Sequence, residues 1–381
     1  MKKHYNIIIA GAGGIAEATG LILAEWSQVT PTIFVGNRTL AKAQSVAEWI
    51  KKGTTKNCTV EAFYFAENKI TAQMQAVLTK GDIILDCLPG SEAPRIARLA
   101  REYHLHYANL TEYVAETEEI KSLAKEAKTG FILQTGIAPG YINVLANSLF
   151  QKFCSEHQTD TVEKLEFKVG ALTKNAVAPH YYGFTWSPVG VATEYLKKAT
   201  VLRNYKKTEI PALSERTSVI LNGIMYEADL TSGGAADLPD ALCGKVRNLN
   251  YKTLRFPGHY DWIHKQLITI GNHENTIQEL QNIMQKKIPL IEEDQIILYA
   301  AVEGRDKKGI LRRKEVHKCI LPQRIGNYTL RAIQTTTSAP LVQSAQLLLD
   351  NNLKGIILQS QLETESFLNG NFIVPVYGKT E

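Results

Sequence analysis

Three glycines near the start of the chain have the spacing of a turn that binds phosphate. Gly11, Gly13 and Gly14 follow a short apolar run and precede an apolar helical pattern. The first glycine permits a tight turn, and the next two let the backbone approach a pyrophosphate at the start of the helix. Ala16 stands where the third glycine of this motif is usual, and alanine is small enough for close packing. We therefore expect the turn, with Ile15 as its last contact, to hold NAD(H) or NADP(H).

The end of the second expected strand bears on which dinucleotide is bound. Asn37, Arg38 and Thr39 stand there, without the Asp or Glu that usually binds the ribose 2′-hydroxyl in NAD-preferring sites. A guanidinium next to a hydroxyl suits a 2′-phosphate, because it offers a planar fork of donors. This pattern favours NADP. The alternative is that Arg38 merely stacks on the adenine, which permits either cofactor.

Later strands are expected to end at the same edge of the sheet, where open α/β sheets bind their ligands. Leu88 and Pro89 follow the fourth strand and are expected to pack against the nicotinamide ring. Cys87 lies beside them, although a small buried apolar role is the more usual one for such a cysteine. Asp86, at the end of the strand, is interpreted equally as a cap or as a reactive group. The other residues expected to contact the cofactor are Asn109, Thr111 and Pro139.

Four motifs in the middle of the chain carry a resemblance to a known family. They are GIAPG at 136–140 with Asn143, TWSPVG at 185–190, TSGG at 231–234 and TLRFPGH at 253–259. In this order they resemble the saccharopine dehydrogenase family, which includes saccharopine reductases and lysine 6-dehydrogenases. The resemblance implies a Rossmann domain joined to an α/β substrate domain, usually in a homodimer. It also implies hydride transfer between NAD(P) and a carbon bearing an amine, through an imine.

Two residues of the last motif suit this implied chemistry. Oxidation of an amine needs a base, and His259 has a suitable ordinary pKa and follows a Pro-Gly bend expected to keep it in a loop. The alternative is a histidine that caps a helix or bonds a backbone carbonyl. Arg255 is the candidate anchor for the carboxylate of an amino-acid substrate. A structural ion pair is the alternative for Arg255, and Arg247 competes with it for the anchoring role.

Other residues of these motifs are expected to line the substrate site. Ser187 would supply a hydroxyl and Trp186 an apolar wall, although an isolated tryptophan more often belongs to the core. Gly233 and Gly234 are expected to allow close backbone approach to the ligand. Tyr181 and Tyr182 offer a phenol as proton donor, but such a pair more often fills the core or an interface, which is the interpretation favoured here.

The elements that position these residues alternate in the first part of the chain, as in a parallel sheet with crossover helices. The expected strands are 6–10, 32–36, 59–65, 83–86, 106–108 and 130–134, and the expected helices are 16–27, 40–51, 70–79, 93–103 and 114–128. A helix over 142–153 opens a second region with strands at 165–169, 218–220, 296–302 and 317–321 and a helix over 276–287.

The fold class expected is therefore α/β, with a Rossmann dinucleotide-binding domain over 1–140 and a mixed-sheet substrate and dimerisation domain over 141–330. The segment 331–381 is expected to return to the first domain through a helix over 330–349. A chain of 381 residues is long enough for two hydrophobic cores.

Composition excludes several classes of protein. The net charge of +5 is interleaved along the chain without a basic block, which argues against nucleic acid as a partner. The five cysteines form no metal-binding or disulfide spacing, so no metal site is expected. No apolar run approaches the length of a membrane span, and we expect a cytoplasmic protein with a small-molecule substrate.

Several functions are compatible with these sequence features. NADP-dependent transfer of hydride at the C–N bond of an amino acid, as in saccharopine dehydrogenases, is the leading hypothesis. The alternatives are a lysine 6-dehydrogenase, a carboxynorspermidine-type reductase and a non-catalytic NADP-binding sensor.

Overall fold

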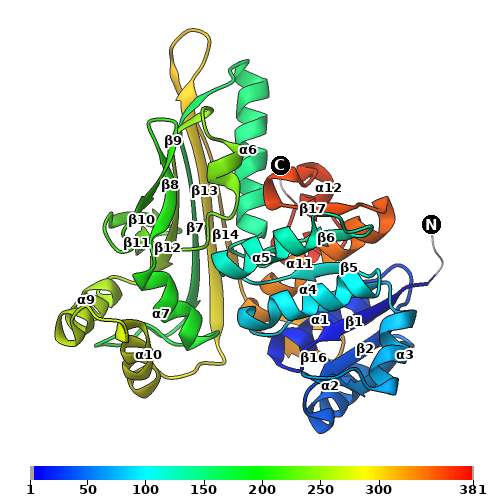
Figure 1. Cartoon of the computed structure of the whole chain (residues 1–381). Helices are drawn as coiled ribbons and strands as arrows, with labels where there is room; N and C mark the ends of the chain where they lie inside the picture. The colour runs from blue at the N-terminus through cyan, green and yellow to red at the C-terminus, as the bar shows by residue number, and fades with distance from the viewer. Residues whose placement is uncertain (1–3, 380–381) are drawn as a thin grey trace. The chain divides into compact units, whose positions relative to one another are not determined.

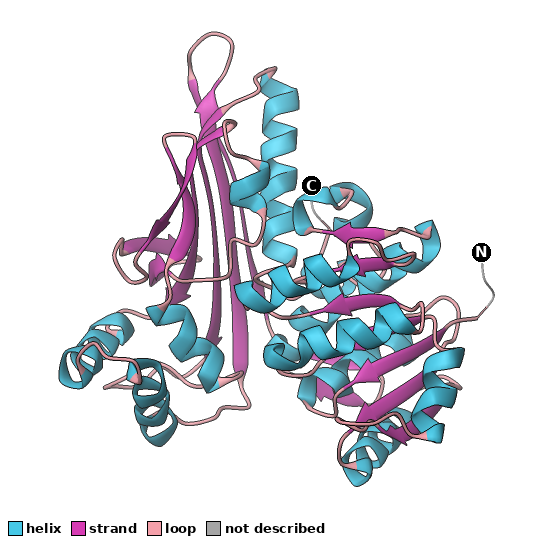
Figure 2. Ribbon diagram, in the orientation of Figure 1, coloured by secondary structure: helices cyan, strands magenta, loops and turns pink. Residues whose placement is uncertain are grey.

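The computed structural model describes residues 4–379 and divides the chain into two compact units. Unit 1 comprises the chain up to Tyr141, Gln323–Leu330 and the chain from Gln334 onward. Unit 2 comprises Ile142–Pro322 and Arg331–Ile333. Figure 1 labels the elements of both units, and Figure 2 separates helices from strands.

Unit 1 contains a seven-stranded sheet in the order β17-β6-β5-β4-β1-β2-β3, and every pair of neighbours is parallel. The strands are β1 (Asn6–Ala10), β2 (Thr32–Asn37), β3 (Thr59–Tyr64), β4 (Ile83–Asp86), β5 (His106–Asn109), β6 (Gly130–Ile132) and β17 (Gly355–Ile357). The crossover helices are α1 (Gly14–Trp26), α2 (Leu40–Gly53), α3 (Ala72–Lys80), α4 (Ala93–Glu102) and α5 (Val114–Ala124). The α/β class and the parallel N-terminal sheet predicted from the alternation are confirmed.

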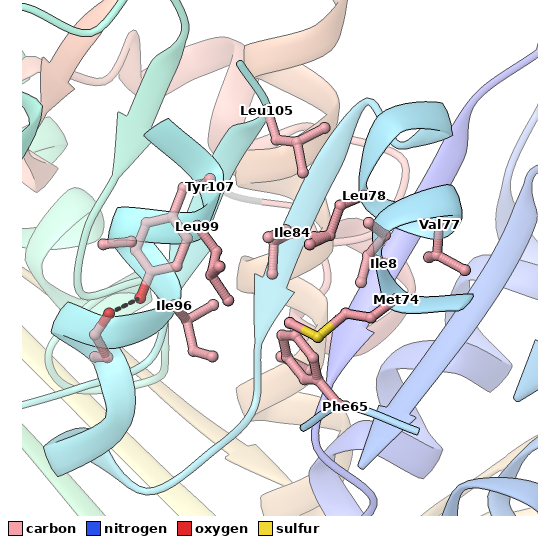
Figure 3. Packing of buried hydrophobic residues seen from close by; sticks show 14 of the residues in the cluster. Ile8, Phe65, Met74, Val77, Leu78, Ile84, Ile96, Leu99, Leu105 and Tyr107 are labelled. Carbon is pink, nitrogen blue, oxygen red and sulfur yellow. Dashed lines mark hydrogen bonds between the residues drawn. The ribbon is translucent and has the colours of Figure 1, made fainter. Parts of the chain in front are cut away.

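The core of unit 1 explains why its central strands are apolar without interruption. In β1, Ile7, Ile8 and Ile9 are all buried, as expected for a parallel strand covered on both faces. On one face, Ile8 and Ile84 belong to the same buried cluster as Met74 of α3 (Figure 3). On the other face, Gly20 of α1 lies so close to Ile9 and to α2 that a side chain there would meet them. Helices on both faces thus fix the strand ends that form one edge of the sheet.

The end of the chain returns to unit 1. After β15 (Gln323–Ile325) and β16 (Tyr328–Leu330), helix α11 (Ala332–Asn351) packs beside α1, where Ser338 accepts a hydrogen bond from Thr19 at 3.1 Å. The Gln334 side chain donates to Gly14 O at 2.9 Å, so α11 also supports the start of α1. The predicted return is confirmed. Strand β17 was not predicted, since three residues are too few to show a pattern. The short helices α12 (Thr364–Leu368) and α13 (Val374–Tyr377) follow.

Unit 2 contains an eight-stranded mixed sheet whose main path is β10-β11-β12-β7-β13-β14; off this path, β8 pairs with β12 and β9 pairs with β8. Only β12 and β7 pair in parallel; the other pairs are antiparallel. The strands are β7 (Val162–Thr173), β8 (Ala199–Arg203), β9 (Lys206–Ile210), β10 (Thr217–Leu221), β11 (Ile224–Leu230), β12 (Val246–Arg255), β13 (Asp294–Arg305) and β14 (Leu311–Ile320). The predicted mixed sheet is confirmed.

The helices of unit 2 are α6 (Tyr141–His157), α7 (Pro188–Leu196), α8 (Leu238–Ala241), α9 (His259–Ile270) and α10 (Thr276–Lys287). Helices α7, α9 and α10 share a hydrophobic cluster with Tyr182 and Phe184. The prediction of α10 is confirmed at both ends. Neither α7 nor α9 was predicted. Helix α7 begins at the proline of a Ser-Pro pair and α9 follows a Pro-Gly pair, and both pairs are equally typical of turns.

The described part of the chain shows further features that bear on function. No helix in residues 4–379 has the length and apolar character needed to cross a membrane. Over the same range, no three His, Cys, Asp or Glu side chains gather where they could bind a metal ion. All five cysteines are free thiols.

Candidate functional site

The glycine turn of unit 1 leaves space for a ligand. Gly11 has a φ of 121°, which favours glycine, and a Cβ there would lie 3.0 Å from the carbonyl oxygen of Cys87. Gly13, the N-cap of α1, has no atom within 4 Å of the position of a Cβ, and Gly14 begins the helix. Half-buried Ile15 follows. The backbone at Gly13 is thus open at a helix N-terminus, which fits a pyrophosphate.

The turn after β2 is exposed at the same edge. Asn37 Oδ1 accepts a hydrogen bond from the Thr39 N–H at 2.8 Å, so the asparagine shapes the turn. The Arg38 side chain is 74% exposed and donates from Nη1 to Glu67 Oε1 at 3.0 Å. An exposed guanidinium at this position is accessible to the adenosine end of a dinucleotide.

Asp86, at the end of β4, holds the loop that follows it. Its carboxyl group accepts hydrogen bonds from Leu88 N at 3.0 Å and from the Tyr107 hydroxyl at 2.8 Å. Burial raises its pKa to about 7, although these two hydrogen bonds oppose the shift. Burial also raises the pKa of Cys87 to about 12, so its thiol is protonated at neutral pH. Leu88 is half-buried and Pro89 exposed, and Asp86 acts as the cap that orients them.

The ends of β5 and β6 supply buried polar groups. Asn109 is 1% exposed, and its Oδ1 accepts a hydrogen bond from Gln134 N at 2.9 Å. Its Nδ2 makes no hydrogen bond of normal geometry within the described residues, although the side chain also interacts with the Tyr107 hydroxyl. Thr111 accepts from the Tyr113 N–H and lies against Gly90, and Pro139 is buried. A buried donor without an acceptor in normal geometry, at the same edge as the glycine turn, fits a site completed by a dinucleotide.

In unit 2, Arg255 is the last residue of β12 and is 1% exposed. Its Nε donates to the Tyr195 hydroxyl at 2.7 Å and its Nη1 to the carbonyl oxygen of Leu254 at 3.0 Å. Its Nη2 lies 3.4 Å from Glu194 Oε1, the longest of these contacts. The guanidinium also lies over the ring of Tyr182, 4.7 Å from the centroid. Each guanidinium nitrogen therefore has a partner within unit 2.

His259 continues this hydrogen-bond chain. Its Nδ1 lies 2.7 Å from the carbonyl oxygen of His180, and its Nε2 lies 3.0 Å from the Tyr195 hydroxyl. Because a carbonyl oxygen only accepts, Nδ1 carries the proton and Nε2 accepts from Tyr195. The Arg255 Nε–H, the Tyr195 O–H and the His259 Nδ1–H thus donate in sequence. We call these three residues, together with the His180 carbonyl, the relay.

The structure corrects the expected surroundings of His259. The histidine is the first residue of α9 and is fully buried, so the expectation that the Pro-Gly bend keeps it in a loop is wrong. Burial, reinforced by the charge of Arg255, lowers the pKa of His259 to about 3. The imidazole is neutral at physiological pH, and both ring nitrogens are engaged. This geometry matches the alternative interpretation, a histidine bonded to a backbone carbonyl.

The TWSPVG segment lies beside the relay. Tyr182 and Thr185 are buried, and neither hydroxyl makes a hydrogen bond of normal geometry in the part of the chain that the structure describes. Trp186 is partly buried against the cluster of α7, α9 and α10, and Ser187 is exposed at the start of α7. The structure therefore brings Arg255, Tyr182 and Trp186 into one region of unit 2.

Three other candidates have structural explanations of their own. A side chain at Gly234 would meet the ring of Tyr251 at 2.2 Å, so this glycine permits internal packing. Gly233 has a φ of 85°, which favours glycine in the turn. Arg247 lies at the opposite end of β12 from Arg255, about 27 Å away at about 3.4 Å per residue. It is exposed and pairs with Glu163 at 3.1 Å.

Three residues of these sites were not predicted from the sequence. Tyr195 and Glu194 lie on α7, and the proline at its first position was the available signal, because proline favours the first turn of a helix. Glu67 follows β3, and no local pattern connects it with Arg38, 29 residues earlier.

Comparisons with known proteins agree with this arrangement. The family model described as the saccharopine dehydrogenase NADP binding domain matches residues 7–133. The model described as the saccharopine dehydrogenase C-terminal domain matches residues 136–370. Together with the open glycine turn, these matches show that unit 1 binds NAD(P).

A curated relative is the mitochondrial alpha-aminoadipic semialdehyde synthase of Mus musculus, 24% identical over 144 residues. The match covers 37% of this chain and 15% of that protein, so this chain aligns with a small part of a much longer relative.

Two solved structures share the fold. Apo saccharopine dehydrogenase (L-Glu forming) from Saccharomyces cerevisiae has a TM-score of 0.72 and 13% identity over 97% of this chain and 96% of that one. The homospermidine synthase of Legionella pneumophila in complex with NAD has a TM-score of 0.65 and 12% identity over 98% and 90%. The family resemblance expected from the motifs is confirmed, since one family model alone covers more than half of the chain: this protein belongs to the saccharopine dehydrogenase family.

Proposed function

We propose that this protein is an NADP-dependent oxidoreductase that transfers hydride at the C–N bond of an amino acid. The observation that carries the proposal is the open helix N-terminus at Gly13 in a chain whose two halves both match saccharopine dehydrogenase domains. The bound dinucleotide would supply the hydride donor or acceptor.

Unit 1 would hold the cofactor along the edge described above. Gly11, Gly13 and Gly14, followed by Ile15, would bind the pyrophosphate through backbone N–H groups. Arg38, with Asn37 and Thr39, would bind the 2′-phosphate.

The nicotinamide end would lie at the later strand ends. Asp86 would keep Cys87, Leu88 and Pro89 in place through its hydrogen bond to Leu88 N. Asn109, whose buried Nδ2 makes no hydrogen bond of normal geometry in the described residues, would bind an oxygen of the ligand. Thr111 and Pro139 would complete this wall.

Unit 2 would bind the substrate through Arg255. The Nη2 contact with Glu194 is longer than the Nε contact with Tyr195, so a substrate carboxylate would replace Glu194 rather than disturb the relay. The buried hydroxyl groups of Tyr182 and Thr185, which make no hydrogen bond of normal geometry among the described residues, would donate to the same carboxylate. Trp186 and Ser187 would border this site, with Gly233 and Gly234 supporting its backbone.

We propose a positioning role for His259 in place of base catalysis. The imidazole accepts from Tyr195, whose oxygen in turn accepts from Arg255, so its neutral form fixes the orientation of the guanidinium. Arg247 is left out of the site, because its distance along β12 separates it from Arg255. We further propose a cytoplasmic homodimer, in line with the family resemblance and the composition of the chain.

Absorbance at 340 nm tests the activity with NADP and NAD against saccharopine, lysine, ornithine and norspermidine conjugates. We expect turnover with NADP and an amino-acid substrate. Turnover with lysine alone, or with a norspermidine conjugate alone, would assign the substrate to one of the alternative activities. Binding of NADP without turnover of any amine would refute the enzymatic proposal and support a sensor.

The variant Arg38→Asp tests the proposed 2′-phosphate contact. Loss of the cation should weaken NADP binding much more than NAD binding, because only NADP carries the extra phosphate. Titration with each nucleotide measures this difference. An equal loss of affinity for both would contradict the role and favour stacking of Arg38 on the adenine.

A further inference from the structure

The ion pair between Arg38 and Glu67 places a carboxylate at the adenosine end of the nucleotide site. Register pairs Asn37 of β2 with Tyr64 of β3, and Phe65 N donates to Asn37 O at 3.0 Å. The chain after β3 therefore runs beside the turn after β2. Glu67 reaches Arg38 from this loop at 3.0 Å, and its side chain is 43% exposed.

Exposure makes both charged groups available to a ligand. Arg38 is 74% exposed, so neither member of the pair is held by burial. An exposed pair of this kind contributes little to stability, and its partners exchange readily. A nucleotide at this edge would meet a cation and an anion side by side.

The two groups act in opposite directions on the two cofactors. A carboxylate accepts hydrogen bonds from the ribose hydroxyls of NAD, as the acid at the end of the second strand does in many NAD-binding sites. The same carboxylate repels a 2′-phosphate and competes with it for the guanidinium. Asn37 cannot supply this negative charge, and its Oδ1 is already engaged by Thr39.

We propose that Glu67 is a specificity-determining residue, which supplies from the loop after β3 the carboxylate that the turn after β2 lacks. Paired with Arg38, it admits NAD(H) as well as NADP(H) and moderates the preference for NADP(H). This inference rests on the nucleotide site of unit 1 and is independent of the substrate and of the reaction.

The test is direct binding of NADPH and NADH to the purified full-length protein, followed by nucleotide fluorescence. Glu67→Gln should tighten NADPH binding about three- to tenfold and weaken NADH binding about two- to threefold, as expected for exposed charges. Glu61→Gln is the matched control, because Glu61 is an exposed residue of β3 and its loss changes the net charge equally. The control should leave the ratio of the two affinities unchanged.

Added salt and a second variant sharpen the test. The difference between the wild type and Glu67→Gln should shrink as salt is raised toward about 1 M, because exposed charges are screened. In an Arg38→Ala background, the gain in NADPH affinity from Glu67→Gln should be smaller, since the competition for the guanidinium is gone.

The outcomes separate this inference from the proposed function. If Glu67→Gln leaves the ratio of NADPH to NADH affinity at the wild-type value, or changes it no more than Glu61→Gln does, Glu67 does not determine specificity. If the wild-type protein binds neither nucleotide, the cofactor site itself is refuted together with the inference. The expected shift in ratio supports it even if no amine substrate is turned over.

Discussion

The candidate residues of the two units lie in opposite surroundings. At the edge of unit 1, Gly13 has open space beside it and Arg38 is 74% exposed. In unit 2, Arg255 is 1% exposed and His259 is fully buried, and both are bonded to Tyr195. In unit 1 a ligand would complete the site, whereas in unit 2 protein groups already satisfy the polar atoms of Arg255 and His259.

This difference shows that residue type alone does not determine how much a charged side chain contributes to stability. Arg38, Arg247 and Arg255 are all paired with a glutamate, yet only Arg255 is buried. A buried charge cannot regain hydration when a partner is lost, while an exposed one exchanges its partner for water. Arg255 is therefore both a candidate substrate contact and a stabilising element of unit 2.

The largest effect is expected from Arg255→Ala. Its removal deprives the Tyr195 hydroxyl of its donor and leaves Glu194 without this cation, so the free energy of unfolding should fall by about 3–5 kcal/mol. Urea denaturation followed by circular dichroism measures the loss. A loss below about 1 kcal/mol would show that the buried cluster is not a stabilising network and would weaken the contrast between the units.

Acid should destabilise unit 2 through His259. The folded-state pKa is about 3 against an ordinary 6.5, so between these values the unfolded chain binds a proton that the folded protein does not. This group therefore lowers stability as pH falls below about 6.5, by at most about 1.4 kcal/mol per pH unit.

His259→Gln removes the titrating group, so the decline in stability between about pH 6 and pH 4.5 should be shallower by roughly 2 kcal/mol in total. Denaturation midpoints of the wild type and the variant, measured across this pH range, compare the two declines. A constant difference in stability at neutral pH does not affect this comparison. Parallel curves for the two proteins would mean that His259 is protonated normally in the folded state. The variant should also keep the pH dependence of turnover, because a neutral positioning residue does not titrate there.

Gly13→Ala tests whether the open glycine turn of unit 1 binds the nucleotide. A Cβ at Gly13 meets no protein atom and the φ of −106° suits alanine, so stability should stay within about 0.5 kcal/mol of the wild type. The methyl group would occupy the space of the pyrophosphate, and the Kd for NADPH should rise at least about tenfold, or about 1.4 kcal/mol. Fluorescence titration measures it. Unchanged affinity would place the nucleotide away from this turn.

The smallest effect is expected from Arg247→Ala, which serves as a control for Arg255→Ala because both arginines lie on β12. The ion pair with Glu163 has exposed fractions of 49% and 34%, and such pairs contribute about 0–1 kcal/mol. The free energy of unfolding and the turnover should both stay close to wild type. A loss of turnover without a loss of stability would contradict this prediction and indicate that Arg247 contributes to substrate binding.

The sequence predicted unit 1 better than unit 2 for a physical reason. The strand β1, its glycine turn and α1 are adjacent in the chain, so their apolar periodicity and turn residues can be read from one short segment. The helix α9 starts at His259 after a Pro-Gly pair, and the partners that bury it come from α7 and from the loop at His180. A local pattern could not distinguish this helix from a loop.

The candidate site residues also differ in whether the sequence alone could identify them. Gly11, Gly13 and Arg38 were identified because their positions after β1 and β2 have a meaning that follows from the order of the elements. Glu67, Tyr195 and Glu194 were not, because they matter through side-chain contacts that no spacing shows. The roles of all these residues in binding or catalysis stay predictions until the variants are measured.

By itself, the sequence determined the nucleotide-binding turn, the α/β class and the family, because each depends on short segments or on motifs in a fixed order. Only the tertiary structure decided the protonation state of His259 and the partners of Arg255. Tyr195 and the His180 carbonyl lie 64 and 79 residues from His259 in the chain, and folding brings both to its ring. Burial then removes the water that would otherwise keep the imidazole near its ordinary pKa.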